Sequence, residues 1–155
     1  MTERRDRPPD GAPRRAMVLA AGLGARMRPM TDRLPKPLIE IGGRSMLDRV
    51  IDALEAQGVR RVVINAHHLA PVLEHHIAGR HSPGLRLCIE AERLETGGGV
   101  ANALPLLGSE PFFVINGDVL WRDGPRPTLQ DLAFAWDDRR MDGLLLLHPV
   151  ATALG

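Results

Sequence analysis

Short apolar runs alternate with amphipathic segments along most of this chain, and this alternation constrains the fold more than any other feature. Residues 16–20, 61–66, 85–91, 112–115 and 143–147 have the composition of strands, and helices are predicted at 46–57, 71–78, 100–107 and 128–140. Such alternation favours a parallel sheet with helices on both faces. We therefore predict an α/β fold, a Rossmann-like three-layer sandwich around a mostly parallel sheet.

The two ends of the chain differ from this pattern. Residues 1–15 are charged and rich in proline, so we predict a disordered tail there and a core over 16–155. A signal peptide is the competing interpretation, but the apolar run after the tail is short and the tail carries acidic residues. No closing helix or strand follows the run at 143–147, so we expect the core to be the N-terminal part of a larger domain.

Composition narrows the possible partners and the compartment. The formal net charge is +1 and aromatic residues make up 3% of the chain, so we expect no nucleic-acid partner. No apolar stretch is long enough to cross a membrane. The single cysteine, Cys88, excludes an intramolecular disulfide and suits a reducing compartment, so a cytoplasmic location is expected. Oligomeric state does not follow from these data.

A glycine loop follows the first predicted strand. It reads Leu-Ala-Ala-Gly-Leu-Gly-Ala-Arg-Met-Arg-Pro over 19–29. Small residues after a strand let backbone amides approach phosphate oxygens, and Arg26 adds a guanidinium suited to a polyphosphate. A dinucleotide fingerprint would need a third glycine and a P-loop would need Gly-Lys-Ser/Thr, and neither is present. A tight turn with surface arginines is the alternative.

Lys36 is the only lysine among twenty basic residues, and prolines flank it on both sides. The prolines predict an extended, stiff segment that presents the ammonium in one direction. In a chain that otherwise uses arginine, a retained lysine suggests that a compact charge is required. Positioning and electrostatic stabilisation are what phosphoryl transfer requires of a protein.

Together these motifs resemble those of the sugar-1-phosphate nucleotidyltransferases. The resemblance rests on the glycine loop and on Pro-Lys-Pro-Leu at 35–38. It continues through Glu-Thr-Gly-Gly-Gly at 95–99 and Asn-Gly-Asp at 116–118, and it covers 16–150. Within the family, the run over 103–108 is most similar to the N-acetylmuramate-1-phosphate uridylyltransferases. The resemblance implies the nucleotide-diphospho-sugar transferase fold and transfer from an NTP, here UTP, to a sugar 1-phosphate, here N-acetylmuramate 1-phosphate. It also implies pyrophosphate release, a cell-wall role in peptidoglycan recycling, and Mg²⁺ as cofactor.

The resemblance also implies roles for particular residues. Arg26, Lys36 and Asp118 would be catalytic, and Asp118 would bind the Mg²⁺ ion. The nucleotide would contact a set of small or apolar residues, namely Leu19, Ala20, Ala21, Gly22, Gly24, Gly97 and Gly98. The sugar would contact three polar residues, Asn65, Glu95 and Asn116. Family members usually supply a second metal-binding aspartate downstream, and here it would lie beyond Gly155.

Other functions remain open. A mannose-1-phosphate guanylyltransferase or a glucose-1-phosphate thymidylyl- or uridylyltransferase would share these motifs. A non-catalytic nucleotide-sugar sensor would keep the fold without turnover. A dinucleotide-dependent oxidoreductase is disfavoured because no acidic residue ends the second predicted strand, where Asn65-Ala66-His67 stands instead. A zinc site among the histidines has no supporting spacing.

Overall fold

The computed structural model describes residues 11–147. Contacts divide the chain into two compact units, residues 13–122 and a second unit that includes 123–147. The expected core over 16–155 spans both. The first strand begins at Arg15, and the carbonyl of Arg14 accepts hydrogen bonds from the amides of Arg60 and Arg61 at 2.8 and 3.2 Å. The predicted disordered tail is therefore wrong at its last residues, which the sheet orders, and residues 1–10 lie outside the described part.

The larger unit is built on a parallel sheet of four strands. They are β1 (Arg15–Leu19), β2 (Arg61–Ala66), β3 (Gly84–Ile89) and β4 (Phe113–Asn116), in the order β3-β2-β1-β4. Strand β1 pairs in parallel with both β2 and β4, and β2 pairs in parallel with β3. Strands β2 and β3 thus follow one another outward on one side of β1, and β4 returns to the other side of β1. This arrangement confirms the predicted α/β class.

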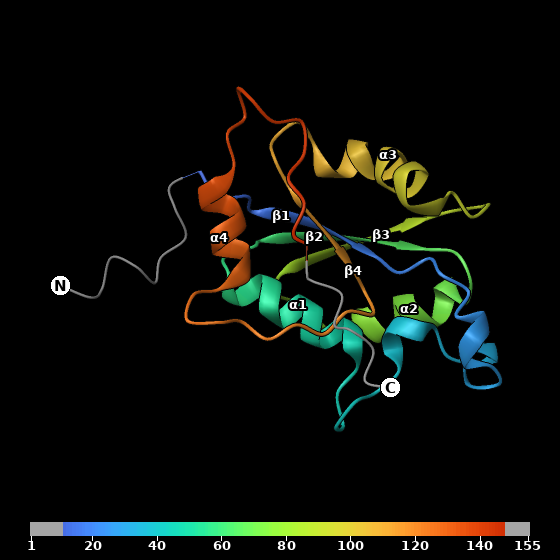
Figure 1. The fold of residues 1–155 in the computed structure, drawn as a ribbon. Helices are drawn as coiled ribbons and strands as arrows, with labels where there is room; N and C mark the ends of the chain where they lie inside the picture. Colours follow the sequence, from blue (N-terminus) through green and yellow to red (C-terminus); the bar gives the residue numbers. More distant parts are fainter. Residues whose placement is uncertain (1–10, 148–155) are drawn as a thin grey trace, which may run out of the picture. The chain divides into compact units, whose positions relative to one another are not determined.

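Three helices cover the sheet. Helices α1 (Met46–Ala56) and α2 (Ala70–Ile77) lie on one face, and α3 (Glu95–Leu107) lies on the other (Figure 1). The three predicted layers are therefore present in this unit. Helix α3 is longer than the predicted 100–107 because it begins at Glu95 and includes all three glycines of the Glu-Thr-Gly-Gly-Gly run.

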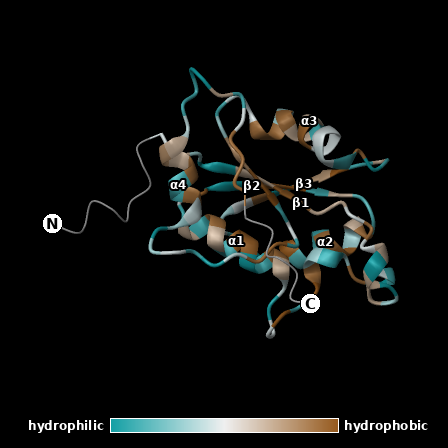
Figure 2. Cartoon of the chain, viewed as in Figure 1, coloured by the Kyte–Doolittle hydropathy of each residue, from teal (hydrophilic) through white to brown (hydrophobic). Residues whose placement is uncertain are grey.

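The core is made by the two central strands and the helix faces packed on them. Met17, Val63 and Cys88 form one cluster with Ala103 and Leu107 of α3. Figure 2 shows apolar colour along the middle of the sheet and alternating apolar and polar colour along α1. Burial and the charge of Glu90 raise the pKa of the Cys88 thiol, against a hydrogen bond from Asn102 that lowers it. Cys88 is thus a buried core residue, as predicted.

Helix α1 is fixed at its start and along its exposed side by polar contacts. The hydroxyl of Ser45 accepts a hydrogen bond from the Asp48 amide at 3.0 Å, which is an N-terminal cap. The guanidinium of Arg80, after α2, lies 2.8 Å from Asp52 and 3.0 Å from Glu55. His76 of α2 lies 3.0 Å from Asp48. These contacts join the two helices on the same face of the sheet.

Strand burial departs from the prediction at the outer strands. Nearly continuous apolar runs predicted strands buried on both faces, but Val114 of β4 is 44% exposed and Ile89 of β3 is 58% exposed. Only the two central strands, β1 and β2, are buried along nearly their whole length. The reason is that β3 and β4 are the outer strands of this sheet, and one side of each lacks a covering helix over part of its length.

The second unit contains helix α4 (Thr128–Ala135), shorter than the predicted 128–140. The amide of Thr128 donates to Asp123 at 2.8 Å, and Arg126 pairs with Asp131 at 3.1 Å. The strand predicted at 143–147 is wrong, since these residues form no strand and Leu145 and Leu147 are each 80% exposed. Hydrophobicity alone makes no strand without a hydrogen-bonded neighbour, and no described strand pairs with this run.

Within 11–147, no helix combines the length and the hydrophobicity needed to span a bilayer.

Candidate active site

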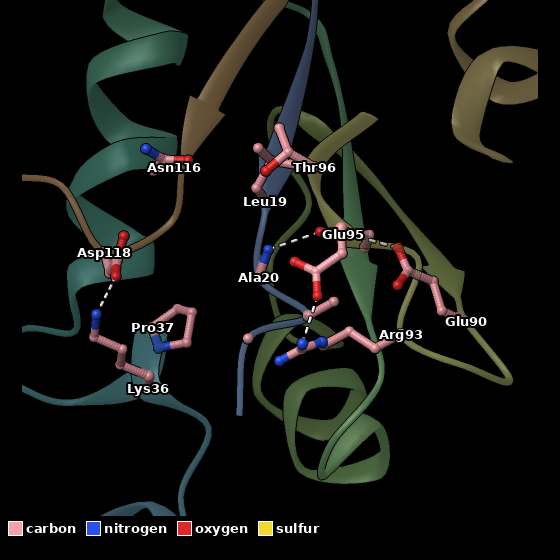
Figure 3. A pocket seen from close by; sticks show the side chains of 13 residues that line it. Leu19, Ala20, Lys36, Pro37, Glu90, Arg93, Glu95, Thr96, Asn116 and Asp118 are labelled. Atoms are coloured by element: carbon pink, nitrogen blue, oxygen red, sulfur yellow. Dashed lines mark hydrogen bonds and ion pairs between the residues drawn. The ribbon is translucent and has the colours of Figure 1, made fainter. Parts of the chain in front are cut away.

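A cleft opens at the carboxyl edge of the sheet in the larger unit. The carboxyl ends of β1, β2, β3 and β4 meet there with the start of α3, as parallel strands require. Most of the predicted site residues line this cleft. They are Leu19, Ala20, Ala21, Gly22, Lys36, Asn65, Glu95, Asn116 and Asp118. Figure 3 shows Lys36 and Asp118 pointing toward one another on one side of the Leu19–Ala20 segment, with Glu95 and Arg93 on the other side.

The glycine loop presents free amide donors to the cleft. The amide of Ala20 is occupied, because it donates to Oδ1 of Asn65 at 2.7 Å. The amides of Ala21, Gly22 and Leu23 have no acceptor among the residues that the structure describes. Successive free backbone amides after a strand are a favourable site for phosphate oxygens. The free donors of the loop therefore begin at Ala21, one residue after Ala20.

Gly24 shapes the loop without lining the cleft. Its φ is +61°, and a Cβ there would lie 2.7 Å from Cγ2 of Thr31. The hydroxyl of Thr31 donates to the Gly24 carbonyl at 2.8 Å. Glycine is required at this position by both the left-handed backbone and the contact with Thr31. Gly24 thus fixes the turn into the short 3₁₀ helix η1 (Ala25–Met27).

Lys36 lies in a tight turn rather than in the extended segment that its flanking prolines predicted. Residues Lys36–Leu38 form the 3₁₀ helix η3, closed by hydrogen bonds from Leu38 to Pro35 at 2.8 Å and from Ile39 to Lys36 at 3.1 Å. Pro37 and Leu38 are buried, and this burial together with the turn hydrogen bonds overrides the extended preference. The expected stiffness still applies, since proline fixes φ on both sides of the lysine.

The ammonium of Lys36 pairs with the carboxylate of Asp118. Their side chains are 27% and 31% exposed, so each faces the cleft while part of its surface is covered. Asp118 follows β4 through Gly117, whose amide donates to the Leu19 carbonyl at 2.9 Å. A Cβ on Gly117 would lie 3.0 Å from the same carbonyl oxygen. Glycine therefore lets the β4 end approach β1 closely and directs Asp118 into the cleft.

Arg26 lies outside the cleft. It is exposed on η1, and it has no hydrogen-bond or ion-pair partner among the described residues. Its neighbour Arg28 pairs with Asp32 at 3.2 Å. Arg26 is thus a free cation next to the amide loop, and its catalytic role stays a prediction.

The glycines of α3 play three different parts. A Cβ on Gly97 would meet nothing within 4 Å, so its open space is compatible with a ligand at the backbone. A Cβ on Gly98 would lie 2.9 Å from Cβ of Leu94, so protein packing alone requires glycine there. Gly99 is buried against Asn65 and Glu90. Neither Gly97 nor Gly98 lines the cleft itself.

Sequence reasoning missed Glu90 and Arg93, which also line the cleft. Glu90 is buried, with Oε1 accepting from Nδ2 of Asn65 at 2.7 Å and Oε2 accepting from the Leu94 amide at 3.1 Å. Arg93 pairs with Glu95 at the opening of α3. Glu90 ends an apolar run, and a carboxylate at the carboxyl end of a parallel strand is the signal that identifies it.

The residues present fit a magnesium ion bound together with phosphate. Mg²⁺ favours one or two carboxylates with the remaining positions taken by phosphate oxygens and water. Asp118 supplies one carboxylate in the cleft, within reach of the free amides. Over residues 11–147, no group of three histidine, cysteine or acidic side chains is arranged to hold a metal by itself.

Comparison with known proteins agrees with this geometry. The sequence profile of the family described as "Nucleotidyl transferase" matches residues 15–151. The chain belongs to the nucleotidyl transferase family. The motif resemblance is thereby confirmed at the level of the family, on a match that covers all the cleft residues.

Two relatives of this nucleotidyl transferase chain carry the same name. It is 45% identical to the N-acetylmuramate alpha-1-phosphate uridylyltransferase of Caulobacter vibrioides, over 93% of this chain and 62% of that protein. It is 43% identical to the protein of that name from Neisseria meningitidis serogroup B, over 68% of this chain and 47% of that protein. The chain thus spans less than two thirds of the length of either relative.

Among solved structures, HddC from Yersinia pseudotuberculosis complexed with GMP-PN is similar at 33% identity and a TM-score of 0.61. The match covers 67% of this nucleotidyl transferase chain and 47% of HddC. The chain therefore shares the fold of this solved structure over the matched part.

Proposed function

We propose that this protein is a sugar-1-phosphate nucleotidyltransferase that joins UTP to N-acetylmuramate 1-phosphate and releases pyrophosphate. The observation that carries the proposal is the juxtaposition of Lys36, Asp118 and the free amides of Ala21 and Gly22 in one cleft. The two relatives named for this reaction supply the choice of base and sugar. The single cysteine and the use of UTP support a cytoplasmic reaction, in the recycling of cell-wall sugars.

In the proposed reaction, a phosphate oxygen of the sugar phosphate attacks the α-phosphorus of UTP. The bond from that phosphorus to the bridging oxygen breaks, and pyrophosphate leaves with the bond electrons. The amides of 21–23 would hold phosphate oxygens, and the Lys36 ammonium would offset negative charge on the reacting phosphates. Arg26, free on η1, would reach toward the departing pyrophosphate.

Asp118 would hold Mg²⁺ together with the phosphate oxygens of the nucleotide. A bound Mg²⁺ supplies charge neutralisation and alignment of the reacting groups. The side chain of Asp118 serves this purpose because Gly117 aims it into the cleft while its pairing with the Lys36 ammonium orients it. Asn116 and Glu95, which also line the cleft, remain our candidates for sugar contacts.

Pyrophosphate release tests this proposal. UTP, GTP, dTTP and ATP are each assayed with Mg²⁺ against N-acetylmuramate 1-phosphate, mannose 1-phosphate and glucose 1-phosphate. We expect release only when a nucleotide and a sugar phosphate are both present, and fastest for UTP with N-acetylmuramate 1-phosphate. Affinity for each nucleotide is measured on the same protein, so that a defect in binding is separated from a defect in turnover.

A guanylyltransferase is the second candidate, favoured by the similarity to HddC, which was solved with GMP-PN. Faster release from GTP than from UTP would select it. Nucleotide binding without any release, across the whole panel, would reject the enzyme and favour a nucleotide-sugar sensor.

A further inference from the structure

A chain of hydrogen bonds runs beneath the cleft from the glycine loop to the start of α3. The Ala20 amide donates to Oδ1 of Asn65 at 2.7 Å, and Nδ2 of Asn65 donates to Oε1 of Glu90 at 2.7 Å. The Leu94 amide donates to Oε2 of Glu90 at 3.1 Å. Asn65 and Glu90 are each only 3% exposed. Figure 3 shows Glu90 directed toward the Ala20 segment from the β3 end.

The donors and acceptors in this series of hydrogen bonds admit only one arrangement. Both ends are backbone N–H donors, so both ends require acceptors. The carbonyl oxygen of Asn65 must therefore face Ala20, and its NH₂ group must face Glu90. Glu90 then accepts on both oxygens, as a carboxylate does. A glutamine at this position would place a donor opposite one of the two donors.

Among the described residues, no cation pairs with the Glu90 carboxylate to offset the cost of burying its charge. Its side chain forms no ion pair among the described residues, and the nearby Arg93 pairs with Glu95 instead. A buried charge held only by neutral hydrogen bonds is unfavourable for stability. Retention of such a group under a cleft points to a role in arranging the cleft.

Two features of the backbone depend on this series of hydrogen bonds. A Cβ on Gly99 would lie 2.8 Å from both Nδ2 of Asn65 and Oε1 of Glu90, so only glycine leaves room for the pair. Glu95, directly after the held Leu94 amide, has a φ of +58°. A left-handed backbone at a non-glycine residue persists only where its surroundings hold it.

We propose that Asn65, Glu90 and Gly99 form a positioning unit that sets the spacing between the glycine loop and the start of α3. This inference rests on the proposed function, in which the amides after Ala20 hold phosphate oxygens of the nucleotide and Glu95, at the start of α3, contacts the sugar. The free amides of 21–23 begin directly after the held Ala20, and Gly97 follows the held Leu94 by three residues. The unit acts through the backbone, so these are positioning residues and not catalytic ones.

Three substitutions test the unit, each with a matched control outside the cleft lining. Glu90→Gln is paired with Glu92→Gln, Asn65→Ala with Asn102→Ala, and Gly99→Ala with Gly79→Ala. Glu92 is exposed and has no hydrogen-bond or ion-pair partner among the described residues, and a Cβ on Gly79 meets nothing within 4 Å. Amide hydrogen exchange at Ala20 and Leu94 is read by NMR without ligand, and the Kd for UTP is measured by calorimetry.

We expect Glu90→Gln to speed exchange at both Ala20 and Leu94 by about tenfold, and to weaken UTP binding by about tenfold, because a buried donor loses its acceptor. Gly99→Ala should act in the same direction while removing no polar group. It serves as the second probe if Glu90→Gln does not fold. The double variant Asn65→Ala/Glu90→Gln should weaken UTP binding by less than the product of the single effects. The controls should change neither exchange nor affinity.

Three outcomes would overturn the inference. If amide exchange became faster at Leu94 but stayed unchanged at Ala20, the two segments would not be linked. Faster exchange at both, with an unchanged Kd for UTP, would reduce the unit to a packing feature. Additive effects in the double variant would mean that the residues act separately. If the unaltered protein bound no nucleotide, the proposed function would fail, and the ligand-free exchange data would still decide whether the segments are linked.

Discussion

The Lys36 ammonium and the Asp118 carboxylate pair across 82 positions of the chain. One comes from a turn bounded by prolines and the other from the end of β4, so neither is brought to the other by local sequence. The pair places the only lysine of the protein beside the carboxylate that we propose as the metal ligand. Both groups remain open to the cleft, where phosphate oxygens would meet them.

Replacement of Lys36 by arginine should abolish most turnover although it keeps the charge. A planar guanidinium is longer and donates in a fixed fork, so it does not reproduce the position of the compact ammonium that pairs with Asp118. We expect kcat to fall by about a hundredfold or more, as when one transition-state donor is lost. The measurement is steady-state pyrophosphate release, with the exposed Arg86→Lys as the matched exchange. A rate near that of the unaltered protein would refute the argument from the single lysine.

Asp118→Asn should remove the effect of Mg²⁺ on nucleotide binding while leaving the fold intact. Asparagine keeps an oxygen acceptor for Lys36 but loses the negative charge that a hard cation prefers. Titration of UTP with and without Mg²⁺ by calorimetry checks this, and Asp138→Asn, an exposed position, is the control. An undiminished gain in affinity on adding Mg²⁺ would place the ion elsewhere.

Glu95→Gly should be more stable than Glu95→Ala. Both variants remove the exposed pairing with Arg93, but only glycine relieves the left-handed backbone at φ +58°. The difference in free energy of unfolding should be about 1 kcal/mol in favour of glycine. Urea denaturation of the two variants measures it. If alanine proved the more stable, residue 95 would not be strained in the folded protein.

Stability should depend on the ionisation of Asp48. Burial tends to raise its pKa, but the hydrogen bond from Ser45 and the charge of His76 outweigh burial and hold the pKa below its ordinary value of 3.8. The unfolded chain therefore binds this proton more readily than the folded one. The stabilisation is complete above the ordinary value and is lost as the pH falls through the lower folded pKa. The free energy of unfolding of Asp48→Asn should lie below that of the unaltered protein near neutral pH, and the gap should narrow below about pH 4. Urea denaturation across this range is the measurement, and a constant gap would contradict it.

Much of the fold follows from sequence pattern alone. The RVVINA run at 61–66 became β2 with its predicted bounds, and residues 46–57 became α1 to within one residue, because periodicity and a serine cap act locally. The motif residues at the strand ends lie together in the structure because the carboxyl ends of parallel strands share one edge. The leucine run at 143–147 shows the limit of this reasoning, because a strand exists only with a partner.

The sequence by itself determined the family, the parallel α/β order and most of the residues that line the cleft. Each of these depends on spacing within a short segment or on the alternation of segments. Tertiary structure alone decided that Lys36 faces Asp118, that Asn65 is bonded to Ala20 and Glu90, and that Gly99 makes room for that pair. These contacts join residues 25 to 82 positions apart, or depend on where a Cβ would point. No local pattern encodes such distances, because they arise only when the strands are set side by side.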